Sequence, residues 1–295
     1  MSLELRNICY TYNPGTPMQQ EVLKDINLVV DKGEFIGLIG HTGSGKSTLI
    51  QHMNGLVTPT SGQVLFDGTD ISTPGFDKRM LRSRVGMVFQ YPEHQLFEET
   101  VFKDICFGPG NLKLPEEEIK ARAEEAMRLT GVPADFANRS PFELSGGQKR
   151  RVAIAGVLAM KPEYMILDEP TAGLDPGGRE EILGLLKELH EQSGITIIIV
   201  SHSMEDMANY AKRLVVLNAG RIVLSGTPRE VFRHVGELDE YGLSVPQVTV
   251  IMHALKEKGF AVDTDVTTVA EAKAEILAAL GRRTDGTGKG GASHA

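Results

Sequence analysis

The sequence predicts an α/β fold with a mostly parallel central sheet. Short apolar runs alternate with stretches of helical periodicity between residues 35 and 200, which is typical of parallel strands joined by helices. Residues 195–200 are β-branched throughout, as in a strand that is buried on both faces. The chain has 295 residues, of which 41 % are hydrophobic and 24 % charged. This composition is usual for a globular protein and excludes disorder over most of the chain.

The N-terminal part contains mainly strand patterns. Asn13–Pro17 is dense in turn residues and separates the first two strands. The apolar run at 35–39 leads into a glycine-rich turn, and a helical pattern begins directly after that turn. The predicted elements are strands at 3–12, 22–30, 35–39, 62–66 and 84–89, and a helix at 46–54.

Helical patterns dominate the remainder. The helix at 115–129 begins with three glutamates, which suit the positive end of a helix dipole. In the helix at 178–192 the apolar residues Ile182, Leu185, Leu186 and Leu189 follow the spacing of one helical face. The other predicted elements are helices at 147–159, 248–258 and 269–280, and strands at 164–167 and 195–200.

Charge and cysteine usage exclude several classes of protein. The formal net charge is -8, whereas a dedicated nucleic-acid-binding protein is usually basic. Cys9 and Cys106 are too few for a disulfide framework, and they fit a reducing cytosol. No apolar run approaches the roughly 18 residues that span a bilayer, and the N-terminus lacks a signal-peptide pattern. We therefore expect a soluble chain that a partner would have to hold at any membrane.

A phosphate-binding loop is predicted between the strand at 35–39 and the helix at 46–54. Gly40–Ser47 matches G-x-x-x-x-G-K-[ST] in the strand-to-helix context that the motif requires. Small residues let several backbone N–H groups point at one phosphate, and the helix N-terminus favours negative charge. The lysine can reach the β- and γ-phosphates, and the serine can ligate Mg²⁺. An ordinary glycine-rich turn is the weaker alternative. The predicted phosphate-binding residues are Gly40, His41, Thr42, Gly43, Ser44, Gly45, Lys46, Ser47 and Thr48.

Polar residues at the ends of three other strands complete the predicted site. Asp168 is assigned to the Mg²⁺ shell and Glu169 to polarising the attacking water, on the expectation that their strand lies beside the phosphate-loop strand. The alternative is a solvated acidic pair. His202 is predicted to sense the γ-phosphate, although a lone histidine is often structural. The amide of Gln90 could touch both Mg²⁺ and the water, which chemistry alone does not decide.

A second glycine-containing helix start lies 20 residues before Asp168. It resembles the signature motif of ATP-binding cassette (ABC) ATPases, and other motifs of that family follow in order over residues 3–235. Gln90 resembles the Q-loop glutamine, and His202 resembles the switch histidine. Tyr12 resembles the residue that stacks on adenine. The signature is formed by Leu144, Ser145, Gly146, Gly147 and Gln148; Asp168 and Glu169 resemble the Walker B end, and Asp175 the D-loop aspartate.

This resemblance implies a fold, a substrate and a dimer. It implies a nucleotide-binding domain over 1–230 with an antiparallel β subdomain and a helical subdomain at about 91–160. In the family the signature of one cassette completes the site of a second, so two ATP molecules with Mg²⁺ would be bound between two cassettes. The D-loop departs mildly from the family pattern at Ala172 and Gly173, but no catalytic residue is missing, so an active ATPase is expected.

A narrower resemblance points to the A components of energy-coupling factor (ECF) transporters. It rests on Gln90–Phe97, Thr100–Val101 and Phe107–Pro109, and Tyr10–Pro17 resembles the second of the two A paralogues. It implies a second cassette of a different paralogue, a transmembrane T component and substrate-binding S components for vitamins or transition-metal ions. The chain would then be peripheral to the cytoplasmic face of the membrane.

The sequence after Gly226 has a different texture. Residues 231–281 are predicted to form a small helical extension, which in the resembled family helps to hold the dimer together. The tail at 282–295 is rich in glycine and has nothing to bury, so it is predicted to be disordered.

Two further patterns leave alternatives open. Leu96, Phe97 and Val101 are predicted to be exposed in a groove for a T-component helix, or else to be core residues of the helical subdomain. The basic run 149–151 would contact nucleotide across the dimer or a partner, or else form a solvated helical face.

Three other functions compete with the ECF interpretation. A soluble ABC protein acting on ribosomes or DNA usually carries two cassettes or an inserted coiled coil, and neither is present. Another transporter class is disfavoured by Tyr91–Phe97 together with the short extension. A non-enzymatic scaffold is disfavoured by Glu169 and His202.

Overall fold

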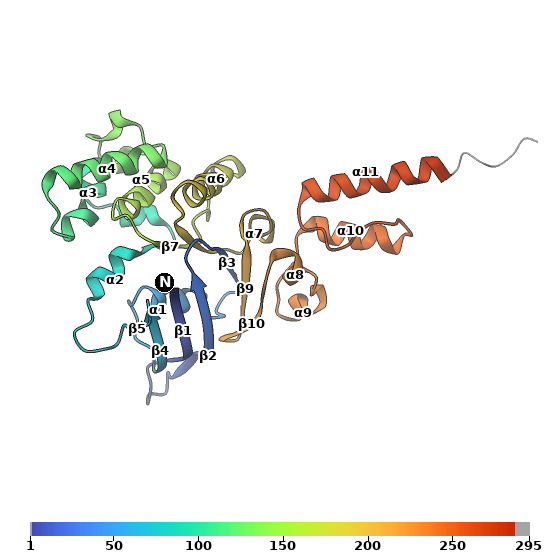
Figure 1. Ribbon diagram of the computed structural model, residues 1–295, viewed down its shortest axis with the longest axis horizontal. Coiled ribbons are helices and arrows are strands. Elements are labelled where there is room, and N and C mark those ends of the chain that lie inside the picture. Colours follow the sequence, from blue (N-terminus) through green and yellow to red (C-terminus); the bar gives the residue numbers. More distant parts are fainter. Residues whose placement is uncertain (1, 287–295) are drawn as a thin grey trace, which may run out of the picture.

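Two sheets organise the protein. The computed structural model describes residues 2–286 (Figure 1). The larger sheet has six strands in the order β10-β9-β3-β8-β7-β6, and all neighbours are parallel except β10 and β9. The prediction of a mostly parallel central sheet is therefore confirmed. Its strands are β3 (Phe35–Ile39), β6 (Val85–Val88), β7 (Tyr164–Asp168), β8 (Thr196–Val200), β9 (Arg213–Asn218) and β10 (Arg221–Gly226).

The strand order corrects one expectation. The strand that ends at Asp168 does not pair with the phosphate-loop strand, because β8 lies between β3 and β7. Asp168 pairs with Val200, and Val200 pairs with Leu38. Parallel strands end at a common edge of the sheet. His202, which comes after the intervening strand β8, therefore lies at the same edge as Asp168 and the phosphate loop.

The smaller sheet is antiparallel and packs beside the first. Its order is β2-β1-β4-β5, and a hydrophobic cluster that includes residues of α1 fills the space between the two sheets. This confirms the antiparallel β subdomain. The elements are β1 (Ser2–Tyr12), β2 (Gln20–Asp31), β4 (Ser61–Phe66), β5 (Thr69–Asp70) and α1 (Lys46–Met53).

Figure 1 shows the helical subdomain at the upper left, near β7 and away from the antiparallel sheet at the bottom. Its three main helices pack against one another, and a longer helix that follows β7 covers the sheet beside them. The helices between β5 and β9 are α2 (Lys78–Arg84), α3 (Val101–Asn111), α4 (Glu116–Thr130), α5 (Gly146–Leu158), α6 (Pro176–Ser193) and α7 (Met204–Tyr210). The 3₁₀ turns are η1 (Pro92–Gln95), η2 (Ala134–Phe136) and η3 (Pro141–Glu143).

The C-terminal region has two parts. Helices α8 (Pro228–Phe232) and α9 (Val235–Glu240) pack on the main core through Val231, Phe232 and Leu238. Helices α10 (Gln247–Glu257) and α11 (Val269–Gly286) project away from the sheets and enclose a separate small core around Met252 (Figure 1). The main core thus extends to Val245, beyond the predicted boundary at 230. Residues 282–286 of the predicted tail are helical, and 287–295 lie outside the described residues.

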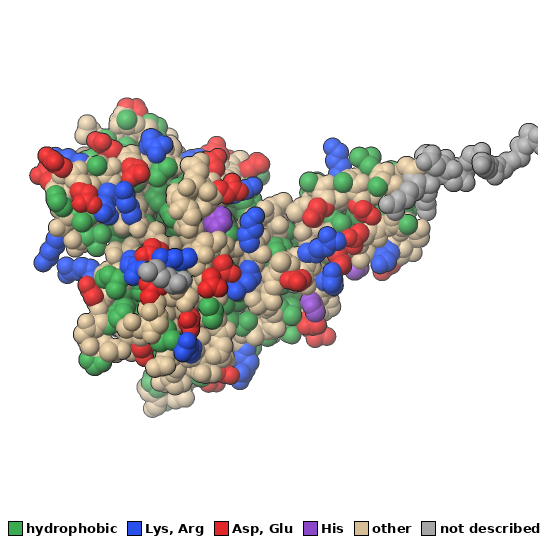
Figure 2. All heavy atoms as spheres, viewed as in Figure 1, with side chains coloured by type: hydrophobic (Ala, Val, Ile, Leu, Met, Phe, Trp, Pro, Cys, Tyr) green, Lys and Arg blue, Asp and Glu red, His purple; other side chains and the backbone are tan. Residues whose placement is uncertain are grey.

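The surface carries no strong charge separation on the side that Figure 2 shows. Acidic and basic side chains lie interspersed over both subdomains and over α10 and α11. Within residues 2–286 no helix combines the length and the apolar character needed to cross a bilayer.

Candidate functional site

The phosphate loop joins a fully buried strand to a helix. Strand β3 ends at Ile39, and α1 begins at Lys46. Gly43 and Gly45 have φ angles of 82° and 107°, which place them in the left-handed region that only glycine adopts without strain. Ser44 is fully buried, and its Oγ has no hydrogen-bond partner among residues 2–286. The loop is thus held in a curled shape that directs its backbone towards the pocket.

Strand β9 and the turn after it pack against this loop and support it. Gly220 N donates a hydrogen bond of 3.1 Å to Ser44 O. A Cβ on Gly40 would lie 2.3 Å from Leu217 O, so the loop and β9 are in direct backbone contact. The β9–β10 hairpin is not among the elements predicted from the sequence, so this support was not expected.

Replacing Gly40 by alanine is expected to lower both stability and ATP affinity. The new methyl group meets a backbone oxygen that cannot move aside, and such overpacking costs about 1–3 kcal/mol. For a protein of this size, Tm should fall by several degrees. Thermal melting and titration with a fluorescent ATP analogue measure the two effects.

Gly184→Ala in α6 is the matched control. A Cβ there has no described heavy atom within 4 Å, and alanine in a helix interior is favoured over glycine by about 0.5–1 kcal/mol. The control should melt at or above the wild-type temperature. Equal melting temperatures of the two variants would contradict the proposed contact between loop and β9.

Lys46 is held over the loop. Its side chain is 6 % exposed, and Nζ donates to Gly40 O at 2.7 Å and to His41 O at 3.0 Å. Burial lowers the pKa of this ammonium, and the carboxylates of Glu169 and Asp168 act in the opposite direction. The lysine therefore brings one buried positive charge to the edge where β3 ends.

Asp168 lies at the end of β7, 8 % exposed, with its carboxylate hydrogen-bonded to Ser47. Burial raises its pKa, while the Ser47 bond and the charge of Lys46 act to lower it. The result is a pair of oxygen ligands, one hydroxyl and one carboxylate, at the start of α1. Oxygen ligands of this kind are what Mg²⁺ prefers in proteins.

Glu169 has a strained backbone conformation. Its φ is 48°, in a region that non-glycine residues rarely occupy. Burial and the neighbouring Asp168 raise its pKa to about 7. His202 Nε2 lies 3.0 Å from Oε1 of Glu169, although this oxygen has no aligned hydrogen bond within the described chain. A carboxyl group with this pKa can accept a proton near neutral pH.

These groups line one cavity of about 430 Å³. Its wall also includes Gln20, Val22 and Val200, which were not predicted from the sequence. Tyr12 pairs with Gln20 in the β1–β2 hairpin, so tracing that hairpin would have found the latter. The predicted residues on the cavity wall are Tyr12, Thr42, Gly43, Gly45, Lys46, Ser47, Thr48, Gln90, Asp168, Glu169 and His202.

Tyr12 stands at one end of this cavity. Its hydroxyl lies 3.2 Å from Thr48 Oγ1, and its ring meets Tyr10 edge-on with centroids 4.8 Å apart. About a third of the side chain is exposed. The ring is therefore held by Tyr10 and still partly exposed, as a ring that stacks on a base would be.

The predicted signature is not part of this cavity. Ser145 and Gln148 form a capping box at the start of α5, in which Gln148 Oε1 accepts a bond of 2.9 Å from Ser145 N. Both residues are exposed. Asp175 is likewise exposed, and it caps α6 by accepting a bond of 2.7 Å from Gly178 N. None of these residues lines the cavity of its own chain.

Two open alternatives are decided by burial. Leu96 and Val101 are 7 % and 0 % exposed and belong to the core of the helical subdomain, although Leu96 also lines a surface groove, whereas Phe97 is 56 % exposed. Of the basic run, Arg150 is only 2 % exposed. Neither a solvated face nor a contact with an outside partner describes that residue.

The chain resembles known proteins over most of its length. The sequence profile of the ABC transporter family matches residues 23–172. The chain belongs to this family. The energy-coupling factor transporter ATP-binding protein EcfA2 of Caldanaerobacter subterraneus subsp. tengcongensis is 55 % identical over 94 % of this chain and 97 % of its own length. The protein of the same name from Clostridium tetani is 54 % identical over 94 % and 96 %.

Solved structures agree with this ABC assignment. The structure of cbiO1 from Clostridium perfringens, described as part of the ABC transporter complex cbiONQ, has a TM-score of 0.72 and 42 % identity. It covers 85 % of this chain and 98 % of that one. A dimeric ATP-binding cassette with ADP and Pi bound, in a post-hydrolysis state, has a TM-score of 0.66 and 32 % identity over 77 % and 98 %. The chain with the sequence given above is thus an ATPase of the energy-coupling factor group.

Proposed function

We propose that this ABC ATPase is one of two cassettes of an ECF importer and energises uptake of vitamins or transition-metal ions. It would lie peripherally at the cytoplasmic face of the membrane and work through a T component and S components. The observation that carries the proposal is the combination, in one chain, of a phosphate-loop cavity containing a carboxyl group with a raised pKa and a separate apolar groove at the surface. The names of the relatives support the same conclusion.

Hydrolysis would use the groups on the cavity wall. The Lys46 ammonium would bind phosphate oxygens, and the Glu169 carboxylate would accept a proton from the attacking water. His202, beside Glu169, would contact the γ-phosphate and keep the carboxylate in place. Tyr12 would stack on adenine.

Mg²⁺ fits the donors present. Ser47, Asp168 and the amide of Gln90 would hold it, and it would neutralise charge on the phosphates. No group of three His, Cys, Asp or Glu residues that could hold a metal occurs within residues 2–286. The ion would therefore need phosphate oxygens as further ligands, as Mg²⁺ in nucleotide sites usually does.

A second cassette would complete the site. The exposed capping box at Ser145 offers backbone N–H groups at a helix start, where an anion is favoured, and it lies away from the cavity of its own chain. We expect the partner to be the other A paralogue. The extension would add to the dimer contact through its exposed apolar side chains Val250, Ile251, Val269, Leu277 and Leu280.

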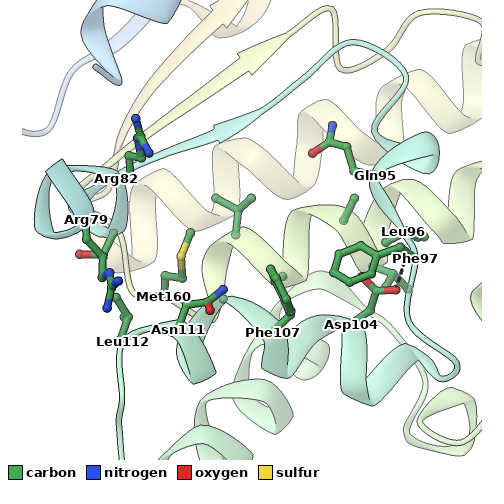
Figure 3. A pocket seen from close by; sticks show the side chains of 16 residues that line it. Arg79, Arg82, Gln95, Leu96, Phe97, Asp104, Phe107, Asn111, Leu112 and Met160 are labelled. Carbon is green, nitrogen blue, oxygen red and sulfur yellow. Dashed lines mark hydrogen bonds between the residues drawn. The ribbon is translucent and has the colours of Figure 1, made fainter. Parts of the chain in front are cut away.

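The T component would dock in a groove of about 580 Å³ between α2, α3 and α5 (Figure 3). Phe97 and Phe107 meet edge-on there with centroids 4.8 Å apart, and both are about half exposed. Asp104 holds the Phe97 segment, because its carboxylate accepts bonds from the backbone N–H groups of Phe97 and Glu98 at 3.0 and 2.9 Å. Arg79 lines the opposite end. An apolar wall with a basic end suits an amphipathic helix with an acidic end.

Affinity purification tests this assembly. From detergent-solubilised membranes, the tagged wild-type chain should recover a second cassette, a multi-helix T protein and small S proteins, identified by mass spectrometry. Phe97→Asp should still recover the cassette but lose at least nine-tenths of the T and S proteins, because a charge would have to be buried in the apolar contact.

Val29→Asp is the control, since Val29 is 44 % exposed on the edge strand β2, away from the groove. It should recover every component. Full recovery of the T protein by Phe97→Asp would refute docking at this residue, and recovery of soluble partners alone from wild type would refute the importer assignment.

A further inference from the structure

Arg150 is a buried cation that joins three separate segments. It lies on α5, two residues after Gln148. Its Nη1 donates to Pro170 O at 2.9 Å and to Ala172 O at 3.0 Å, and its Nη2 lies 3.1 Å from Glu93 Oε2. The side chain is 2 % exposed, and that of Glu93 is 21 % exposed. One guanidinium group thus bonds to two backbone carbonyls on one side and to a carboxylate on the other.

Each of these segments connects to a different functional region. Glu93 lies in η1, between Gln90 at the cavity and Phe97 at the groove. Residues 170–172 directly follow Glu169 and precede Asp175. Helix α5 carries the exposed capping box at its start. The side chain of Arg150 therefore connects η1 to the residues next to Glu169 through hydrogen bonds.

The chemistry of arginine makes this link stiff. The guanidinium is planar and always charged, and its donors form a rigid fork. A charge with so little water around it is stable only while it is paired and hydrogen-bonded. Movement of Glu93 therefore has to be followed by Arg150 or leave a buried cation without its counter-ion, and movement of Arg150 shifts its bonds to residues 170 and 172.

We propose that Arg150 is a positioning residue that couples the docking groove to the segment carrying Glu169 and Asp175. This rests on the proposed docking of a partner in the groove and on the proposed role of Glu169. A displacement of η1 moves the Glu93 carboxylate and, through Arg150, the carbonyl groups of residues 170 and 172. Arg150 does not line the cavity, so it would act through the backbone of residues 170–172 and not on the nucleotide itself.

Hydrogen–deuterium exchange of the isolated full chain tests the link without any partner. Glu93→Gln keeps the size of the side chain but removes the charge opposite Arg150, and charge-assisted hydrogen bonds are about twice as strong as neutral ones. Amide exchange over residues 171–175 should become about tenfold faster. The control is Glu163→Gln, which removes the charge of a carboxylate that pairs with Arg84 and Lys32 just before β7 and makes no contact with Arg150. Exchange over 171–175 should not change in that variant.

Kinetics of the assembled complex give the second readout. Glu93→Gln should lower kcat for ATP at least fivefold while KM stays within twofold, because the phosphate loop makes no contact with Arg150. Arg150→Lys keeps a charge opposite Glu93 but loses the fork, so its kcat should fall similarly and should not fall further when Glu93→Gln is added. Glu163→Gln should keep the wild-type kcat.

Unchanged exchange over 171–175 in Glu93→Gln would overturn the link, whatever the complex does. An additive loss of kcat in the double variant would also overturn it, since two residues acting through one link cannot contribute independently. Failure of the wild-type chain to assemble with membrane proteins would instead contradict the docking proposal and leave the exchange result to decide on Arg150.

Discussion

Glu169→Gln is expected to lower ATP hydrolysis by about 10²- to 10⁴-fold, the usual loss when a general base is removed. Glutamine keeps the size of the side chain and leaves the phosphate loop intact, so ATP affinity should stay within a few-fold of wild type. Single-turnover hydrolysis measures the first quantity, and titration with a fluorescent ATP analogue measures the second.

The control for this variant is Glu181→Gln, which removes an exposed carboxylate on α6 that pairs with Arg151 on α5. Its turnover should match wild type. Near-normal turnover of Glu169→Gln would refute the assignment of the base, and a parallel loss of ATP affinity would point to a damaged pocket instead.

The same substitution should change the response to pH. A base acts in its deprotonated form, and the pKa of Glu169 in the nucleotide-free chain is raised to about 7, so wild-type kcat/KM should rise between pH 6 and 8. With an ordinary carboxyl group the rate would be flat over that range.

Ionising Glu169 in the folded protein is unfavourable, so stability falls as the pH rises from about 4.5 to 7. Glu169→Gln removes this penalty, roughly 3 kcal/mol at pH 8, and its Tm should exceed that of wild type there.

Lys46→Met is expected to weaken ATP binding by roughly tenfold to a hundredfold. Hydrogen bonds to charged groups contribute about 1.5–3 kcal/mol, and Lys46 provides the buried cation at the edge of β3. Methionine keeps an unbranched side chain of similar length, so the effect reports the charge and its hydrogen bonds. Equilibrium titration with the fluorescent analogue gives the affinity.

Lys187→Met is the comparison, because Lys187 is exposed on α6. Its affinity should be that of wild type. If Lys46→Met binds ATP within twofold of wild type, the phosphate is held by the backbone of the loop alone and the proposed role of the lysine is wrong.

The sequence was most informative where a local motif carries its own structural context. The run from β3 through the loop to α1 was predicted almost to the residue, because the glycines, the apolar strand and the helix start all specify one conformation. Helix α3 was missed because Gly108, Pro109 and Gly110 resemble a break in the sequence. It forms because Thr100 caps its start and because Val101 and Ile105 are buried in the core of the helical subdomain.

What could not be predicted is mostly long-range. The order β3-β8-β7 depends on how helices cross the sheet, and no residue of β7 specifies its neighbour. The support of Gly40 by Leu217 requires a hairpin that is distant in the sequence. Arg150 has the composition of a surface residue, and only the position of Glu93 and of two carbonyl groups explains why it is buried.

The strand order β3-β8-β7-β6 also determines the length of the cavity. Asp168 is the last residue of β7, and Gly40, His202 and Gln90 come one or two residues after the ends of β3, β8 and β6. Neighbouring strands lie about 4.8 Å apart, so the row from the phosphate loop to Gln90 extends over roughly 14 Å. This span is fixed by the backbone hydrogen bonds of the sheet. Side-chain substitutions can change the chemistry along the row, but a different span would require a different number of strands.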